Sequence, residues 1–138
     1  MLRADYLLFM TGLRVDRENN NRTTFDGVTS MFFSRELPAT LPNLMAVARV
    51  FPSGNPVVNK PLKVKLVATI DEEEAFATEH TQESITIEKE GGYVAIIPID
   101  GAEFPKFGAY QIKFYANDKL LIERPFYVKN LKDYQAEL

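Results

Sequence analysis

The amino-acid sequence predicts an all-β fold, an antiparallel β-sandwich of about eight strands. Three observations support this: short runs of alternating apolar and polar residues, turn-forming residues between them, and no long helical periodicity. The clearest example is the segment from Phe104 to Val128, where two alternating runs flank Asn117-Asp118. Asn and Asp tolerate the positive φ of a two-residue turn, so this pair predicts a β-hairpin. A hairpin alone is not stable in water, so more sheet must pack against it.

The length and composition suit one domain without chemical cross-links. A chain of 138 residues can bury a sizeable core, and the absence of cysteine excludes disulfides and cysteine-ligated metals. The formal net charge of −3 disfavours nucleic acids and anionic membranes as partners. We expect one domain over residues 1–130, a tail over 131–138 and no cofactor. The apolar run near the start is too short for an export signal, so we expect a cytoplasmic protein.

The first half of the chain predicts four strands, over residues 4–11, 23–33, 44–51 and 62–70. An Asn-rich exposed loop is expected at 17–22, and Gly27 indicates a bulge or a close backbone contact. The prolines in 37–42 interrupt regular structure, so this segment should cross between sheets with Leu37 and Leu41 beneath it. Residues 44–51 are apolar on both faces except at Arg49, as expected of an interior strand covered by a second sheet.

The second half predicts four further strands, over residues 84–88, 93–99 and the two arms of the 104–128 hairpin. Between the halves, residues 71–83 have no strand period, and we expect a loop or a short helical turn there. Gly91-Gly92 should turn the chain. Because proline cannot donate to a sheet ladder, Pro98 should lie at an edge or a bulge.

Tyr110 makes the sandwich prediction more specific. In immunoglobulin-like domains, a tyrosine near the start of the penultimate strand folds back so that its hydroxyl bonds the upstream backbone. Gly108, Tyr110 and Ile112 have this spacing in the penultimate expected strand. We therefore expect an immunoglobulin-like sandwich with either a tyrosine corner or an ordinary strand tyrosine at Tyr110, structural in both cases.

Several short segments together resemble a family of small uncharacterised bacterial proteins. They are Ala4-Asp5-Tyr6, Arg14-Val15-Asp16, Phe25-Asp26-Gly27, the Leu37-Pro38 to Leu41-Pro42 crossing, Gly108-x-Tyr110 and Pro125-Phe126-x-Val128. The chain differs from the family pattern in its longer Asn-rich turn and in Asp71-Glu72-Glu73-Glu74, where many relatives have a compact Asp-Pro-Asp-Gly turn. The resemblance implies a compact β-sandwich of unknown function and brings no catalytic residue.

Few residues offer catalytic chemistry. His80 is the only histidine, so a two-histidine metal site cannot form within one chain. Ser84, His80 and Asp71 supply the residue types of a catalytic triad, but no nucleophile elbow surrounds the serine. Glycine motifs that cradle phosphates are also missing. We therefore predict no catalytic residue and no enzyme, with a small hydrolase as a distant alternative.

Two binding chemistries stay open in the sequence. The acidic run 71–74, with Glu79 or Asp118, could supply oxygen ligands to calcium, although its spacing is that of a solvated charge run. Tyr93, Tyr115 and Tyr127 could stack against a sugar, although strand tyrosines more often pack against neighbouring strands. A carbohydrate- or ligand-binding module is therefore the alternative function.

The run Met31-Phe32-Phe33 gives the leading functional hypothesis. Three consecutive large apolar side chains on a strand cannot all point at one core, because successive side chains alternate between faces. At least one must face outward, against either a covering loop or another protein. We predict a non-enzymatic intracellular protein-interaction module, whose partner is a second copy or an unidentified protein.

Overall fold

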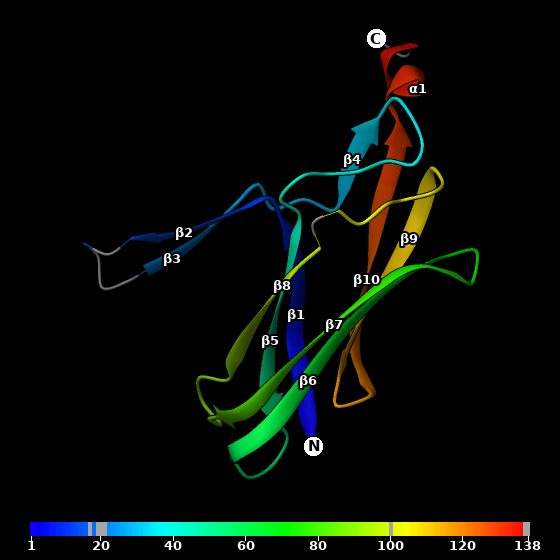
Figure 1. Ribbon diagram of the computed structural model, residues 1–138. Coiled ribbons are helices and arrows are strands. Elements are labelled where there is room, and N and C mark those ends of the chain that lie inside the picture. The colour runs from blue at the N-terminus through cyan, green and yellow to red at the C-terminus, as the bar shows by residue number, and fades with distance from the viewer. Residues whose placement is uncertain (17, 19–21, 100, 137–138) are drawn as a thin grey trace.

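The computed structural model describes residues 1–16, 18, 22–99 and 101–136. The strands are β1 (Leu2–Met10), β2 (Gly12–Asp16), β3 (Arg22–Asp26), β4 (Met31–Ser34), β5 (Met45–Pro52), β6 (Val57–Ile70), β7 (Glu73–Ile87), β8 (Tyr93–Pro98), β9 (Gly108–Ala116) and β10 (Lys119–Asn130), followed by helix α1 (Leu131–Ala136). A five-stranded sheet, β4-β10-β9-β6-β7, faces a three-stranded sheet, β1-β5-β8. The β2-β3 hairpin forms a separate two-stranded sheet that projects from the body (Figure 1).

The predicted fold class is confirmed, because the two layers form an immunoglobulin-like β-sandwich. All the described strand pairs are antiparallel except β4 and β10, which run parallel. The described chain has ten strands rather than about eight. One additional strand is β2, which was not expected. The other arises because the strand predicted at 23–33 is divided into β3 and β4.

That strand divides into β3 and β4 at residues 27–30. Gly27 lies at the division with φ of 67°, and a Cβ atom placed on it would lie 2.2 Å from Oγ1 of Thr11. A close contact is therefore present at this glycine, although the nearest atom belongs to a side chain and not to the backbone that the sequence indicated. The chain divides into two strands there. The loop expected at 17–22 lies mostly outside the described residues.

The proline-containing segment 37–42 connects β4 in one sheet to β5 in the other, as predicted. Leu41 is half-buried against the core. The expectation for Leu37 is wrong, because its side chain is 44% exposed. The inward position belongs to Ala39, which exchanges two backbone hydrogen bonds of 2.9 Å with Phe104.

Strand β7 is the largest error of the sequence-based prediction. Residues 71–83 were expected to form a loop or helical turn, but Glu73–Ile87 is one continuous strand that also contains the separate strand expected at 84–88. Asp71 and Glu72 have φ of 52° and 65° and make a two-residue turn between β6 and β7. Because β7 is an edge strand with mostly exposed side chains, its ladder with β6 determines its structure and no apolar alternation marks it.

The core lies between the two sheets, where the predicted alternation on β6 is confirmed. Its five inward side chains are all buried: Leu62, Val64, Leu66, Ala68 and Ile70. Strand β5 is the interior strand of its sheet, as predicted, with Ala46, Ala48 and Val50 in the core. Only one of its faces meets the second sheet, however. Pro98 ends β8, which is an edge strand, as its proline indicated.

The Asn117-Asp118 turn confirms the predicted hairpin of β9 and β10. The two residues have φ of 49° and 67°, the conformation of a hairpin turn with positive φ at both central positions. The Asn117 side-chain oxygen accepts a hydrogen bond of 3.0 Å from the Lys63 backbone N–H, and Asp118 lies 2.6 Å from the Lys63 ammonium. This hydrogen bond to Asp118 is the main reason why the pKa of Lys63 is raised.

We expect Asn117→Ala to destabilise the protein by about 1–2 kcal/mol, because alanine tolerates positive φ poorly and cannot accept the Lys63 hydrogen bond. Urea unfolding followed by circular dichroism measures the change. Asn55→Ala is the matched control, since Asn55 lies in an exposed loop without positive φ among the described residues. Equal losses for the two variants would contradict this role of the turn.

Candidate interaction surface

Strand β4 separates the three side chains of the Met31-Phe32-Phe33 run. It pairs in parallel with β10, with Met31 opposite Tyr127 and Phe33 opposite Lys129. Phe32 points inward, and its ring centroid lies 5.6 Å from that of Phe104. Met31 and Phe33 point outward and are 41% and 36% exposed. The sequence predicted that at least one of the three faces outward. Two of them do, and Phe32 packs against the core, as strand alternation requires.

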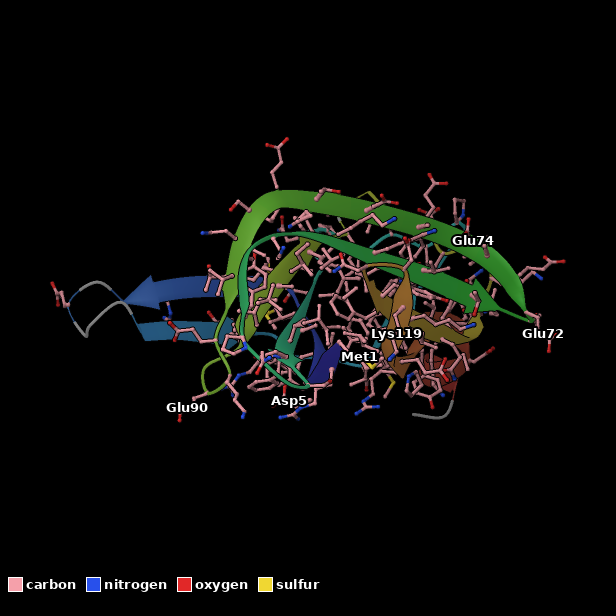
Figure 2. All side chains as sticks on the ribbon, turned by 90° about the horizontal axis from the view of Figure 1, so that it is seen from below. Met1, Asp5, Glu72, Glu74, Glu90 and Lys119 are labelled. Atoms are coloured by element: carbon pink, nitrogen blue, oxygen red, sulfur yellow. The ribbon has the colours of Figure 1, made fainter. Side chains whose placement is uncertain are left out.

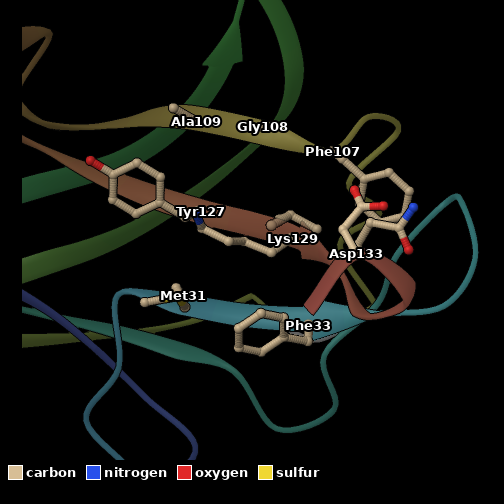
Figure 3. Close-up of a pocket in the computed structure, with 10 residues that line it drawn as sticks. Met31, Phe33, Phe107, Gly108, Ala109, Tyr127, Lys129 and Asp133 are labelled. Carbon is tan, nitrogen blue, oxygen red and sulfur yellow. The ribbon is translucent and has the colours of Figure 1, made fainter. Parts of the chain in front are cut away.

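The outward side chains line an open pocket of about 580 Å³ (Figure 3). Its lining comes from β4, the start of β9, the end of β10 and helix α1: Met31, Phe33, Phe107, Gly108, Ala109, Tyr127, Val128, Lys129, Asn130 and Asp133. Most of these side chains are apolar. We call the outward group Met31, Phe33 and Tyr127 the β4 ridge, because the three lie on the outer surface of β4 and β10.

Two charged groups lie at this pocket. The Lys129 ammonium lies 5.9 Å from the centroid of the Tyr127 ring, within the range of a cation–π contact. Asp133 comes from α1, whose start is capped by the Asn130 side chain accepting a 3.0 Å hydrogen bond from the Lys132 N–H. The pocket therefore offers an apolar wall with one cation and one anion at its margin.

Tyr110 has the geometry of a tyrosine corner. Its side chain is completely buried in β9, and its hydroxyl donates a 2.6 Å hydrogen bond to the Lys106 carbonyl and accepts one of 2.9 Å from the Lys106 N–H. Burial raises the pKa of this hydroxyl. The contact joins the β8–β9 connection to the core and contributes structure rather than chemistry.

The residues of the hypothetical hydrolase set do not meet. His80 and Ser84 lie on one extended strand, β7, so the strand rise separates them by about 13 Å. Asp71 is in the turn that precedes β7, where its carboxylate lies 3.7 Å from the Lys106 ammonium. This arrangement provides no base within hydrogen-bond reach of the serine.

The acidic residues named for calcium also lie apart from one another. Asp118 lies beside Lys63 at the β9–β10 turn, whereas Asp71 lies beside Lys106 at the β6–β7 turn. Among the described residues, no group of three or more Asp, Glu, His or Cys side chains is placed to hold a metal ion. The acidic run borders a turn and continues into an exposed edge strand, where each carboxylate faces solvent.

The tyrosines named for sugar stacking do not form one platform. Tyr93 packs against the core from β8, in the three-stranded sheet. Tyr115 and Tyr127 belong to the five-stranded sheet but pair with Leu120 and Ala109, at opposite ends of the β9-β10 ladder. A planar ring would therefore meet at most one of them.

Sequence reasoning missed a second apolar surface, on the outer side of the three-stranded sheet. Val47 of β5 points away from the core yet is fully buried, and Val94 and Ile96 of β8 beside it are 40% and 43% exposed. The signal was present, since β5 was recognised as apolar on both faces. The expectation of one covering sheet accounts for only one of these apolar faces.

None of the helices in the described ranges is long and apolar enough to cross a membrane. Among solved structures, the chain is similar to a crystal structure described as an immunoglobulin-like protein from Pseudomonas aeruginosa, with 17% identity and a TM-score of 0.45. The similarity covers 94% of this chain and 97% of the other. No curated protein matches the chain. The resemblance drawn from the sequence is confirmed: the model of DUF6941, a family of unknown function, matches residues 10–129, and the chain belongs to this family.

Proposed function

We propose that the chain is a non-enzymatic, intracellular protein-interaction module that binds a protein partner through the β4 ridge and its pocket. The observation that carries the proposal is the outward position of Met31 and Phe33 on an edge strand, beside a pocket with apolar walls. Large apolar side chains gathered around a pocket are the usual centre of a protein interface, where a few such residues provide most of the affinity.

The lining indicates what the partner presents. An aliphatic or aromatic side chain fits against Met31, Phe33 and Tyr127, and polar groups beside it can bond to the Lys129 ammonium or the Asp133 carboxylate. In the described part of the chain, β4 is also an edge strand of its sheet. An extended peptide segment with one large apolar side chain matches both features.

A non-enzymatic role is supported by the separation of the groups that could do acid–base chemistry. His80 and Ser84 lie apart on β7, and the residues that line the pocket include no serine, threonine, cysteine or histidine. The absence of cysteine supports an intracellular site of action. A fold without disulfides does not depend on an oxidising compartment.

The test is capture of partners from native lysate by the purified protein and by Met31→Glu. We expect the variant to capture at least about tenfold less of any specific partner, because the new carboxylate would be desolvated in the interface. Leu120→Glu is the matched control, because Leu120 is 43% exposed, close to the 41% of Met31, and lies outside the pocket lining.

Two results would contradict the proposal. One is equal capture by Met31→Glu and the native chain, which would place the contact elsewhere. The other is the absence of any partner together with a saturable signal on a sugar array or in a hydrolase panel.

A further inference from the structure

The three strands β1, β5 and β8 are apolar on both faces, although the five-stranded sheet covers only one of these faces. Toward the second sheet they place side chains such as Leu7, Ala48 and Ile97, which belong to the core. Their other residues point away from it, yet the sequences DYLLFM, MAVARVF and YVAIIP contain few polar residues at these alternate positions. A solvated sheet face would alternate apolar with polar residues, as β6 does with its lysines.

The outward side chains form three rows across the sheet, set by the strand register. From the end nearest β2 they are Met10-Met45-Pro98, Leu8-Val47-Ile96 and Tyr6-Arg49-Val94. Val47, at the centre, has no exposed surface, and Leu8, its partner on β1, is half-buried. We call this surface the outer face. It lies on a different sheet from the β4 ridge, so the two surfaces are independent.

Two cations lie on the outer face without an anionic partner. The guanidinium carbons of Arg3 and Arg49 lie 4.8 Å and 4.7 Å from the centroid of the Phe51 ring, which they enclose. Arg49 also donates a 3.1 Å hydrogen bond to the Gly91 carbonyl. Within the described part of the chain, neither guanidinium forms an ion pair. A binding partner with carboxylates at matching positions would form an ion pair with each guanidinium.

The β2-β3 hairpin is continuous with this face. Strand β1 ends at Met10, whose side chain is fully buried in the first row, and β2 begins two residues later at Gly12. Figures 1 and 2 show the hairpin projecting from the body of the sandwich, away from β9 and β10. A two-stranded hairpin is marginal in water without packing.

The hairpin is long enough to contact a body that docks on the outer face. Five-residue strands give the hairpin a reach of about 16 Å, and packed sheets lie about 10 Å apart. The hairpin is therefore longer than the gap between two packed sheets. The outer face itself measures about 14 Å by 23 Å, less than half of the roughly 800 Å² that each partner contributes to a stable interface. The hairpin supplies the remainder.

We propose that the occupant is a second copy of this chain, packed outer face against outer face, with each hairpin lying against the other copy. A flat apolar sheet face is complementary to a like face, as in sandwich cores, and a two-fold axis makes such an interface isologous. The margins of the face also carry the required anions. Asp5 on β1 and Glu90 in the β7–β8 turn lie there (Figure 2), within the surface that the two-fold axis brings to Arg3 and Arg49 of the other copy.

Sedimentation equilibrium on the native chain and on Ile96→Glu tests the proposal. We expect the native chain to have twice the monomer mass of 15.7 kDa, and Ile96→Glu to raise the dimer dissociation constant at least about 100-fold. Ile96 is on an edge strand and 43% exposed, so the folded monomer tolerates the change. Leu120→Glu, at a residue of equal exposure, should leave the dimer intact.

A second variant addresses the hairpin. Gly12 and Asp26 pair directly, so replacing residues 13–25 by Asn-Gly closes the chain with a short turn. This variant should retain the sheet spectrum in circular dichroism and sediment as a monomer. A native chain that is monomeric at hundred-micromolar concentration would overturn the proposal, and so would a dimer unaffected by Ile96→Glu. Loss of partner capture in Met31→Glu is a separate result, since that variant should remain dimeric.

Discussion

Phe104→Ala should reduce the free energy of unfolding by about 3–5 kcal/mol, the largest effect expected of any single substitution in this chain. Phe104 is completely buried between the sheets, in the connection that precedes β9. Its ring centroid lies 5.6 Å from that of Phe32, 5.2 Å from Phe76, 5.1 Å from Tyr110 and 5.6 Å from Phe126. Alanine would leave a cavity shared by five segments and remove four ring contacts.

Urea unfolding followed by circular dichroism measures this loss, because the chain has no tryptophan for fluorescence. Since small domains are stable by only about 5–15 kcal/mol, Phe104→Leu provides a milder variant with an expected loss of about 1–2 kcal/mol. Phe33→Ala is the control at a surface phenylalanine that is 36% exposed, with an expected loss of about 1 kcal/mol. A Phe104→Ala variant as stable as Phe33→Ala would show that the aromatic cluster is not central to the core.

Tyr110→Phe should destabilise the protein by about 1–3 kcal/mol while leaving the fold and the oligomeric state unchanged. The substitution removes only the hydroxyl, and with it the 2.6 Å bond to the Lys106 carbonyl and the 2.9 Å bond from the Lys106 N–H. Both backbone groups would then lack their partner in a partly buried position. The connection before β9 should loosen, and thermal and urea unfolding should both record the change.

The same substitution at Tyr115 is the matched control. Tyr115 lies on the same strand, is half-exposed, and its hydroxyl has no protein hydrogen-bond partner in the part of the chain that the structure describes. We expect a change below about 0.5 kcal/mol there. If both variants lost the same stability, the Lys106 contact would contribute nothing beyond an ordinary strand position.

The sequence predicts which side chains face the core, because burial imposes a period of two on half-buried strands. On β6 the inward set from Leu62 to Ile70 is read directly from alternation, and Tyr110 and Ile112 follow from their spacing after Gly108. The same reasoning required at least one of Met31, Phe32 and Phe33 to face outward, but it did not say which. Strand pairing cannot be predicted in this way. The parallel pairing of β4 with β10 is made by backbone hydrogen bonds, which are the same for every residue type other than proline.

The two main errors have one physical origin. Strand β7 has little apolar burial, so its backbone ladder with β6 orders it without leaving a pattern in Glu73–Ile87. The strand over 44–51 presents the opposite situation, with an apolar pattern on both faces but a second sheet on only one. In each case the side-chain pattern shows only which positions are apolar. It does not show which strand pairs with the backbone, or which element covers an apolar face.

The parallel pairing of β4 with β10 also has a consequence for synthesis. Met31, Phe32 and Phe33 leave the ribosome long before Tyr127, Val128 and Lys129, which lie opposite them in the folded sheet. Contacts between segments so distant in sequence form late. For most of translation the nascent polypeptide therefore carries three consecutive large apolar side chains with no strand to receive them, and it depends on dilution or on chaperones until the last strand has been made.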